Sequence, residues 1–400
     1  MLSGICCDAP ATATSFMMNI KTHTAYYGCR KCTTRGVWVG NVVNHFSQAK
    51  TAGRVTFPEL NAALRTDYCF RKRLQVKHHN DDGRKSLIED ILVDVVQDVV
   101  LDYMHLVCIG VRKTDLTIWV SGTFDKFRFS KDTIANISNY MIGIGEYITK
   151  VFARKPRPLT ELPRRKATEL RLDLLYICPV AYKPYLSYER YSHMMLLHVA
   201  IKLLTLLRLY VSSGARLYGA KYVTFNVHNL IHLANDVRKH GSLDDFSAFP
   251  FENKLQKMKN LLRKSGKPLQ QIVRRLDEID KANSSQQPAA NSSTNTKKYT
   301  LNEIHFAGPI FPHFTMATQY KTLRLKNSVL NLTKSENCVL LEDFNDVFLI
   351  ENFVKLQEQI YLVGRRFLTK EDICIHTLYP PVPSTNILYQ IYQLVLNTVH

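Results

Sequence analysis

Two cysteines, Cys29 and Cys32, stand in a turn-rich stretch at a spacing that suits one tetrahedral metal ion. Both thiolates of such a loop can face the same point, so Zn²⁺ is the expected ion. Only one such pair occurs in the sequence, so two more ligands must come from elsewhere. The candidates are His23, His78, His79, Asp102 and His105. We expect this zinc to be structural and to pin a loop-rich segment; two unmetallated cysteines in a turn are the alternative.

Asp8 and Asp102 are carboxylates in positions that could allow them to ligate a metal ion. Asp8 follows the apolar run Ile5–Cys7, which indicates a short buried strand. The end of a strand holds a carboxylate rigidly enough to ligate a metal, and a solvated Asp8 that caps the next turn is the alternative. Asp102 lies three residues before His105, which places both on one helix face. They could ligate metal or form a hydrogen-bonded pair in the core.

His228 and His232 have the spacing of the two helical zinc ligands of zincin metalloproteases. Asn229 stands where those enzymes carry the glutamate that acts as general base. We therefore exclude a metalloprotease, and we expect both histidines to pack or hydrogen-bond within a helical region.

The stretch from Asn253 to Leu276 is basic and contains no acidic residue. A solvated helix usually mixes both signs of charge, so this block favours contact with a phosphate backbone, with a merely soluble helix as the alternative. Its cations are Lys254, Lys257, Lys259, Arg263, Lys264, Lys267, Arg274 and Arg275.

Apolar periodicity predicts the elements that must position these residues. Val37–Val39 and Val55–Phe57 are expected to form a hairpin, and the pattern turns helical from Ser86 onward. A helix is expected from Phe249 to about residue 266, with Pro250 in its first turn, and another from Pro268 to about residue 279. Further helices are expected within residues 130–155, 164–180, 186–212 and 225–240.

The last third of the chain changes character. Residues 281–298 form a polar, low-complexity linker. Short β-like runs then follow at intervals of about ten residues, which predicts a separate β-rich domain. These runs are Cys338–Leu341, Val347–Ile350, Ile360–Val363 and Leu388–Tyr392.

Composition narrows the class of protein. The 53 Lys and Arg residues outnumber the 34 Asp and Glu residues by 19 in 400, an excess that favours a polyanionic partner, most often nucleic acid. Nine unevenly spaced cysteines indicate a reducing compartment. We find no signal peptide and no apolar run long enough to span a bilayer. An intracellular protein, nuclear or cytoplasmic, without membrane association is expected.

Seven motifs follow one another in an order that resembles a family of animal transposon-derived proteins similar to the CACTA (En/Spm-like) transposases. The resemblance covers about residues 3 to 278 and extends more weakly into the tail. The motifs are Cys7–Ala11, Gly28–Cys32, Phe57–Leu60 with Leu64–Asp67, Leu101–Val111, Phe152–Arg157, Asn226–Leu233 and Phe246–Asn253.

The resemblance implies an RNase H-like catalytic core, interrupted by a long helical insertion. Such enzymes cut DNA with an Asp-Asp-Glu triad that binds two divalent ions, usually Mg²⁺. On this mapping Asp8 is similar to the second triad carboxylate and Glu252 to the third. Asp102 and His105 match the family's Asp-x-x-His motif, and the Cys29–Cys32 segment matches its Cys-x-x-Cys.

One departure affects the expected activity. The first triad Asp belongs to an earlier strand, and the seven residues before Asp8 cannot hold the strands that should carry it. We therefore expect an incomplete RNase H-like core of α+β or α/β class that binds Mg²⁺ poorly and binds DNA without cutting it.

The expected organisation has five parts. The truncated core comprises residues 1–89 and a core helix at 246–280, separated by a helical insertion at 90–245. The linker at 281–298 leads to a β-rich accessory domain at 299–400. Two alternatives remain: a piece of an active Mg²⁺-dependent transposase, and a zinc-stabilised scaffold for protein interactions. The sequence leaves the oligomeric state open, a dimer included.

Overall fold

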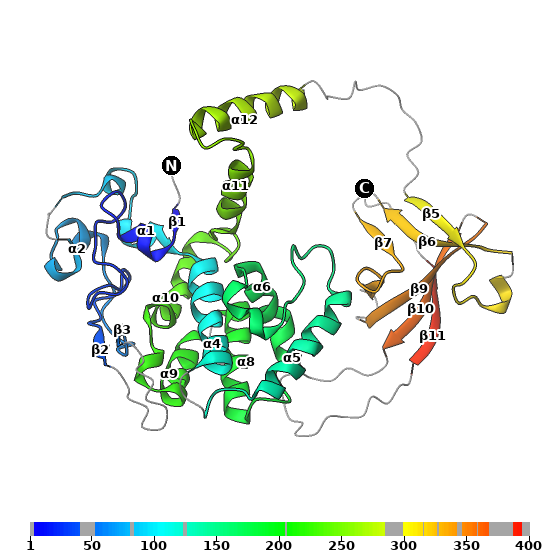
Figure 1. Cartoon of the computed structure of the whole chain (residues 1–400), viewed down its shortest axis with the longest axis horizontal. Coiled ribbons are helices and arrows are strands. Elements are labelled where there is room, and N and C mark those ends of the chain that lie inside the picture. Colours follow the sequence, from blue (N-terminus) through cyan, green and yellow to red (C-terminus); the bar gives the residue numbers. More distant parts are fainter. Residues whose placement is uncertain are drawn as a thin grey trace. The chain divides into compact units, whose positions relative to one another are not determined.

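The computed structural model describes residues 4–40, 53–80, 84–122, 126–204, 206–284, 299–314, 316–325, 328–341, 346–357, 359–367 and 387–393. The chain divides into two compact units: residues 1–141 with 156–287, and residues 142–155 with 288–400 (Figure 1). The expected core segments and helical insertion thus lie in one unit. The expected insertion is wrong at residues 142–155, which group with the C-terminal unit. Helix α12 (Pro268–Ser284) extends into the first residues of the expected linker, and the rest of that linker lies outside the described residues.

Two short parallel strands lie at the centre of the site described below. Strand β1 (Ile5–Cys7) pairs with β4 (Val99–Leu101) in parallel, and Cys7 lies opposite Leu101. The strand predicted at Ile5–Cys7 is confirmed. The helical interpretation from Ser86 onward is wrong at β4, so the boundary at residue 90 separates two paired strands. A short apolar run that is buried on all sides has no periodicity that distinguishes a strand from a helix.

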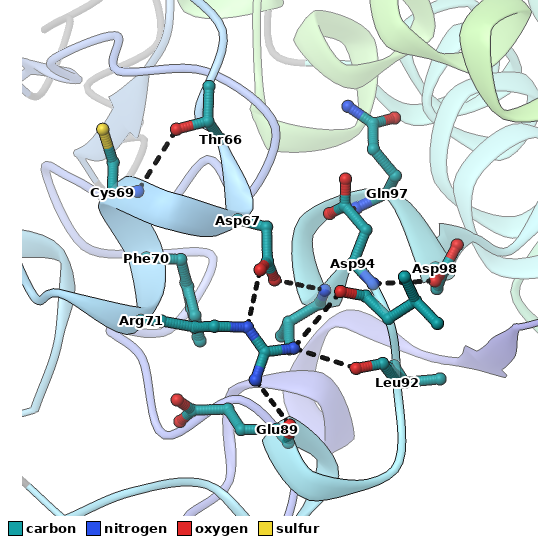
Figure 2. A network of polar contacts seen from close by, with 12 residues as sticks. Thr66, Asp67, Cys69, Phe70, Arg71, Glu89, Leu92, Asp94, Gln97 and Asp98 are labelled. Atoms are coloured by element: carbon teal, nitrogen blue, oxygen red, sulfur yellow. Dashed lines mark hydrogen bonds and ion pairs between the residues drawn. The ribbon is translucent and has the colours of Figure 1, made fainter.

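A polar network fixes the approach to β4. Helix α2 (Asp67–Arg71) ends with Arg71, whose guanidinium donates to the Asp67 carboxylate at 2.6 Å and to the Leu92 carbonyl at 2.9 Å. The second Asp67 oxygen accepts from the backbone N–H of Val95 at 2.8 Å, where α3 (Val95–Asp98) begins. Figure 2 shows these contacts converging between the two helices. Because α3 leads directly into β4, the network also positions that strand.

Helices α3 and α10 (Phe225–His240) pack against β4, and two predictions from the sequence hold in the first unit. The hairpin forms between β2 (Val37–Val39) and β3 (Arg54–Thr56), and a helix covers residues 225–240. The remaining helical elements are α1 (Ala9–Ala13), η1 (Val76–His78), η2 (Leu87–Asp90), η3 (Met104–Arg112), α4 (Lys113–Ser121), α5 (Lys131–Ile144), η4 (Gly145–Tyr147), η5 (Leu159–Arg164), α6 (Ala167–Leu172), η6 (Asp173–Ile177), α7 (Cys178–Ala181), α8 (Tyr188–Leu203), α9 (Leu207–Tyr218), η7 (Ala220–Tyr222), α10 (Phe225–His240), α11 (Phe249–Asn260) and α12 (Pro268–Ser284).

The C-terminal unit is an antiparallel sheet with the strand order β11-β10-β9-β6-β5; β7 pairs with β6, and β8 with β9. Its core contains Leu323, Phe348, Phe353 and Leu362. The β-rich domain is confirmed, and each predicted β-like run lies in a strand. The elements are β5 (Tyr299–His305), η8 (Pro312–Phe314), β6 (Thr318–Leu325), β7 (Val329–Asn331), β8 (Cys338–Leu341), β9 (Asp346–Leu356), β10 (Gln359–Phe367) and β11 (Ile387–Gln393).

Candidate metal centre and carboxylate edge

Four buried side chains converge on one point between the Cys-x-x-Cys loop and α10. Cys29, Cys32, His228 and His232 each place one ligand atom within 4.8 Å of the others. The Sγ atom of Cys32 lies 3.3 Å from Nε2 of His228, and that of Cys29 lies 3.8 Å from Nε2 of His232. The two sulfurs are 3.5 Å apart. These four donors can hold a metal ion such as zinc.

The geometry suits a tetrahedral ion. Zn–S bonds of about 2.3 Å and Zn–N bonds of about 2.0 Å place tetrahedral S···S pairs about 3.8 Å and S···N pairs about 3.5 Å apart. The observed separations lie within a few tenths of an ångström of both values. The Phe57 carbonyl lies 3.0 Å from Nδ1 of His228, which leaves Nε2 of that ring directed at the sulfurs. Such an outer hydrogen bond is typical of a ligating histidine.

The electrostatics of the two thiols differ, although both are buried. Burial acts to raise the pKa of Cys29, but hydrogen bonds from Cys32, His228 and His232 outweigh it and hold this pKa well below its ordinary value. The pKa of Cys32 is raised, mainly by its hydrogen bond with Cys29 and by burial. The cluster therefore favours one thiolate on its own, and a bound dication would favour the second.

The two residues between the cysteines anchor the loop. Arg30 donates to the Oγ1 atom of Thr12 at 2.6 Å and to the carbonyl of Val100 in β4. Lys31 is buried and forms an ion pair of 2.7 Å with Asp236 on α10. The two cysteines thus face the histidines, and the two cations between them contact β4 and α10. A metal at this point would join the loop to the helix.

The ligand set expected from the sequence is wrong in its second half. Cys29 and Cys32 are in the cluster, but His23, His78, His79, Asp102 and His105 are not. The ring of His23 packs edge-on against Phe225, His79 packs against Phe70, and Nδ1 of His78 lies 2.7 Å from the carbonyl of Tyr27. His228 and His232, which we expected only to pack or hydrogen-bond, complete the cluster. Their spacing was the available signal, and the missing glutamate removes only the protease chemistry.

Asp8 and Asp102 lie side by side at one end of the parallel pair. Each follows the last residue of its strand, and those last residues, Cys7 and Leu101, are register partners. Oδ1 of Asp8 accepts from the backbone N–H of Ala11 at 2.7 Å and caps α1. The alternative of a turn-capping Asp8 is therefore confirmed.

Hydrogen bonds surround the Asp102 carboxylate. It accepts from the backbone N–H groups of Met104, His105 and Ala248 at 3.1, 3.0 and 2.8 Å, and its Oδ2 also pairs with Nδ1 of His105. Burial acts to raise the pKa of Asp102, but these bonds outweigh it and leave the pKa below its ordinary value. Asp102 and His105 thus form the hydrogen-bonded pair that was one of the two expectations, and Asp102 also holds the segment that begins α11.

Glu252 is an exposed residue in the first turn of α11. The pKa of His105 is raised, first by its hydrogen bond to Asp102, and the charges of Asp8 and Glu252 add to the effect. Both predicted triad carboxylates therefore lie within electrostatic range of one imidazole, although 244 positions separate them in the sequence. None of the three carboxylates belongs to a group that meets the geometry of the cysteine–histidine cluster among the described residues.

The predicted basic block lies on α11, the turn after it and α12. No described side chain of the two helices is buried. Arg274 and Arg275 form ion pairs with Glu278 at 3.1 and 2.5 Å. Within the described part of the chain, no ion pair involves the other six cations, Lys254, Lys257, Lys259, Arg263, Lys264 and Lys267.

Comparisons with known proteins add one match. A family model described as a domain of unknown function (DUF8592) matches residues 304–395, which cover most of the C-terminal sheet. No curated protein and no solved structure matches the chain. Across the described residues, no helix combines the length and hydropathy needed to cross a membrane.

Proposed function

We propose that this chain is a transposase-related protein that binds duplex DNA through the basic surface of α11 and α12. The observation that carries the proposal is the density of exposed cations between Asn253 and Leu276, a stretch without an acidic residue. Six of these cations form no ion pair with the described residues. Cations without acidic neighbours gain most from a phosphate backbone, because binding releases the counterions that DNA otherwise condenses.

We further propose that zinc fills the cysteine–histidine cluster in a structural role. Four protein ligands close the tetrahedron, whereas a catalytic zinc keeps one position open for water or substrate. The two halves of the ligand set, Cys29–Cys32 and His228–His232, lie about 200 residues apart in the sequence. An ion bound by both halves would therefore stabilise tertiary structure.

The carboxylate edge supports DNA binding without cleavage. Two-metal hydrolysis needs carboxylates that can approach both ions. Asp102 is saturated by hydrogen bonds, and one Asp8 oxygen caps a helix, which leaves the second Asp8 oxygen and Glu252 as ligands for Mg²⁺. The similarity to CACTA enzymes and the RNase H-like core remain predictions, and so does nuclear localisation.

Salt dependence tests the DNA contact. Fluorescence anisotropy with a labelled 30-base-pair duplex should give log K against log [KCl] with a slope of about −5 if six phosphates are neutralised. A variant carrying Lys254→Gln, Lys257→Gln and Lys259→Gln should reduce the steepness of that slope by roughly 3. A slope near zero in the parent protein would exclude phosphate contact.

A matched variant controls for net charge. Lys131→Gln, Lys183→Gln and Lys202→Gln remove the same charge from positions outside α11 and α12 and should leave the slope within about 1 of the parent value. Equal effects of the two triple variants would place the DNA elsewhere. In parallel, incubation of the duplex with Mg²⁺ or Mn²⁺ should give no strand breaks. Cleavage that is lost on Glu252→Gln would favour the active-transposase alternative instead.

A further inference from the structure

A cavity of about 440 Å³ lies in the first unit, and its lining shares no residue with the metal cluster or the basic helices. It opens between η3 and α4 on one side and the end of α9 with η7 on the other, and β3 contributes to its rim. Its volume is in the range of pockets that enclose small organic molecules.

The walls of the cavity are apolar and held in place. Ile118, Phe127 and Tyr218 line it, and the last two rings pack edge to face with centroids 5.1 Å apart. Tyr222 lies beside them and donates from its hydroxyl to Asp115 at 2.7 Å. Asp115 is buried and also accepts a hydrogen bond from the Tyr210 hydroxyl at 2.7 Å. These hydrogen bonds hold the Tyr222 ring in position. A preformed apolar wall favours a flat or aliphatic ligand body.

The polar part of the lining has one sign of charge. Arg54, Lys113 and Lys221 contribute cations, and none of the described lining residues is acidic. The hydroxyls of Thr117 and Ser121 are engaged by carbonyls of their own helix. Burial and the charge of Arg54 lower the pKa of Lys221, so the two cations are close enough to repel each other. An anion bound in the cavity would be attracted to both cations.

We propose that this cavity binds a small amphipathic anion, with an apolar body against Phe127 and Tyr218 and a phosphate or carboxylate group at Arg54 and Lys221. Two sources supply this chemistry: a nucleoside monophosphate, whose base would contact the rings, and a medium-chain fatty acid. The site shares no residue with α11 or α12, so it is independent of the proposed DNA surface.

The fluorescent anion 8-anilino-1-naphthalenesulfonate is a suitable probe for the full-length chain. We expect saturable binding at one molecule per chain, and about tenfold weaker binding after Arg54→Gln with Lys221→Gln, because two charge-assisted contacts are removed. Lys131→Gln with Lys183→Gln removes the same net charge elsewhere and should leave the affinity unchanged. Equal affinity in parent and cavity variant, or an equal loss in both double variants, would overturn the proposal.

Two more measurements separate the cavity from nonspecific adsorption. Ile118→Trp should fill the space and weaken probe binding while the cations remain, and a thermal unfolding curve checks that this variant folds. The neutral probe N-phenyl-1-naphthylamine should bind more weakly than the sulfonate, and equal affinity of the two would contradict an anion site.

Competition then identifies the ligand. Displacement of the sulfonate probe by thymidine 5′-monophosphate alone would assign a nucleotide, and displacement by decanoate alone would assign a fatty acid. Failure of both to displace the probe would refute the proposed ligand class.

Discussion

Removal of the metal ligands should loosen the first unit by an amount that can be worked out. Cys29→Ser with Cys32→Ser deletes both sulfurs from a cluster whose four side chains are at most 3% exposed. The remaining imidazoles of His228 and His232 cannot complete a tetrahedral site. The Cys-x-x-Cys loop would then be held only by contacts such as the Lys31–Asp236 ion pair.

The magnitude follows from mass action. Zinc at a free concentration 100 to 1,000 times its dissociation constant stabilises the folded state by about 2.7 to 4.1 kcal/mol. For a unit of roughly 270 residues, with an unfolding entropy of about 2 cal/mol/K per residue, this corresponds to a fall in Tm of about 5–8 °C. Chelation of the parent protein with EDTA should produce a fall of the same size.

The assay combines metal analysis with thermal unfolding. Purified parent protein should carry about one zinc per chain, and the double cysteine variant and His228→Ala should carry none. His79→Ala is the matched control, because His79 is also buried but lies outside the cluster. The His79→Ala variant should have a lower Tm, because the substitution leaves a cavity beside Phe70, and its zinc content should be unchanged.

Two results would refute this reasoning. Parent protein without bound zinc, even after refolding with the metal, would mean that the cluster is only a packed group of thiols and imidazoles. Zinc loss in His79→Ala equal to that in His228→Ala would mean that the ion lies elsewhere.

Three further outcomes are expected. Asp236→Ala strands the buried ammonium of Lys31 and should lower the free energy of unfolding by about 3–5 kcal/mol in urea, whereas an unchanged midpoint would contradict a buried pair. Gly214→Ala would place a methyl group 2.2 Å from the Tyr222 ring and should lower that energy by about 1–3 kcal/mol; no change would show that the ring can move. The pKa of His105, measured by NMR titration, should lie above 6.5. This raised pKa stabilises the fold below about pH 6.5, and the stabilisation is lost as the pH rises through the folded-state pKa. A measured pKa at or below 6.5 would contradict the carboxylate edge.

The sequence alone determined the local features. Apolar patterns and turn residues predicted the hairpin at 37–39 and 55–57, whose second strand is 54–56 in the structure, together with the strand at 5–7, helix α10 and the strands after residue 336. Each pattern reflects which face of a short segment is buried. The spacing of Cys29 and Cys32 predicted half a metal site, since both ligands lie within one loop. The basic stretch was equally visible, because charge is a property of composition.

The tertiary structure determined which residues come into contact although they lie far apart in the sequence. No local pattern shows that His228 and His232 lie against the Cys-x-x-Cys loop, because a histidine's ligand role depends on what faces it and not on its neighbours in the chain. Strand β4 was missed for the same reason: its partner β1 lies over ninety residues earlier, and a strand buried on every side carries no alternation. The structural role of Asp102 likewise depends on a distant residue, because its carboxylate accepts a hydrogen bond from the backbone N–H of Ala248. Contacts of this kind arise from packing between segments that are distant in the sequence, and no local pattern of residues indicates them.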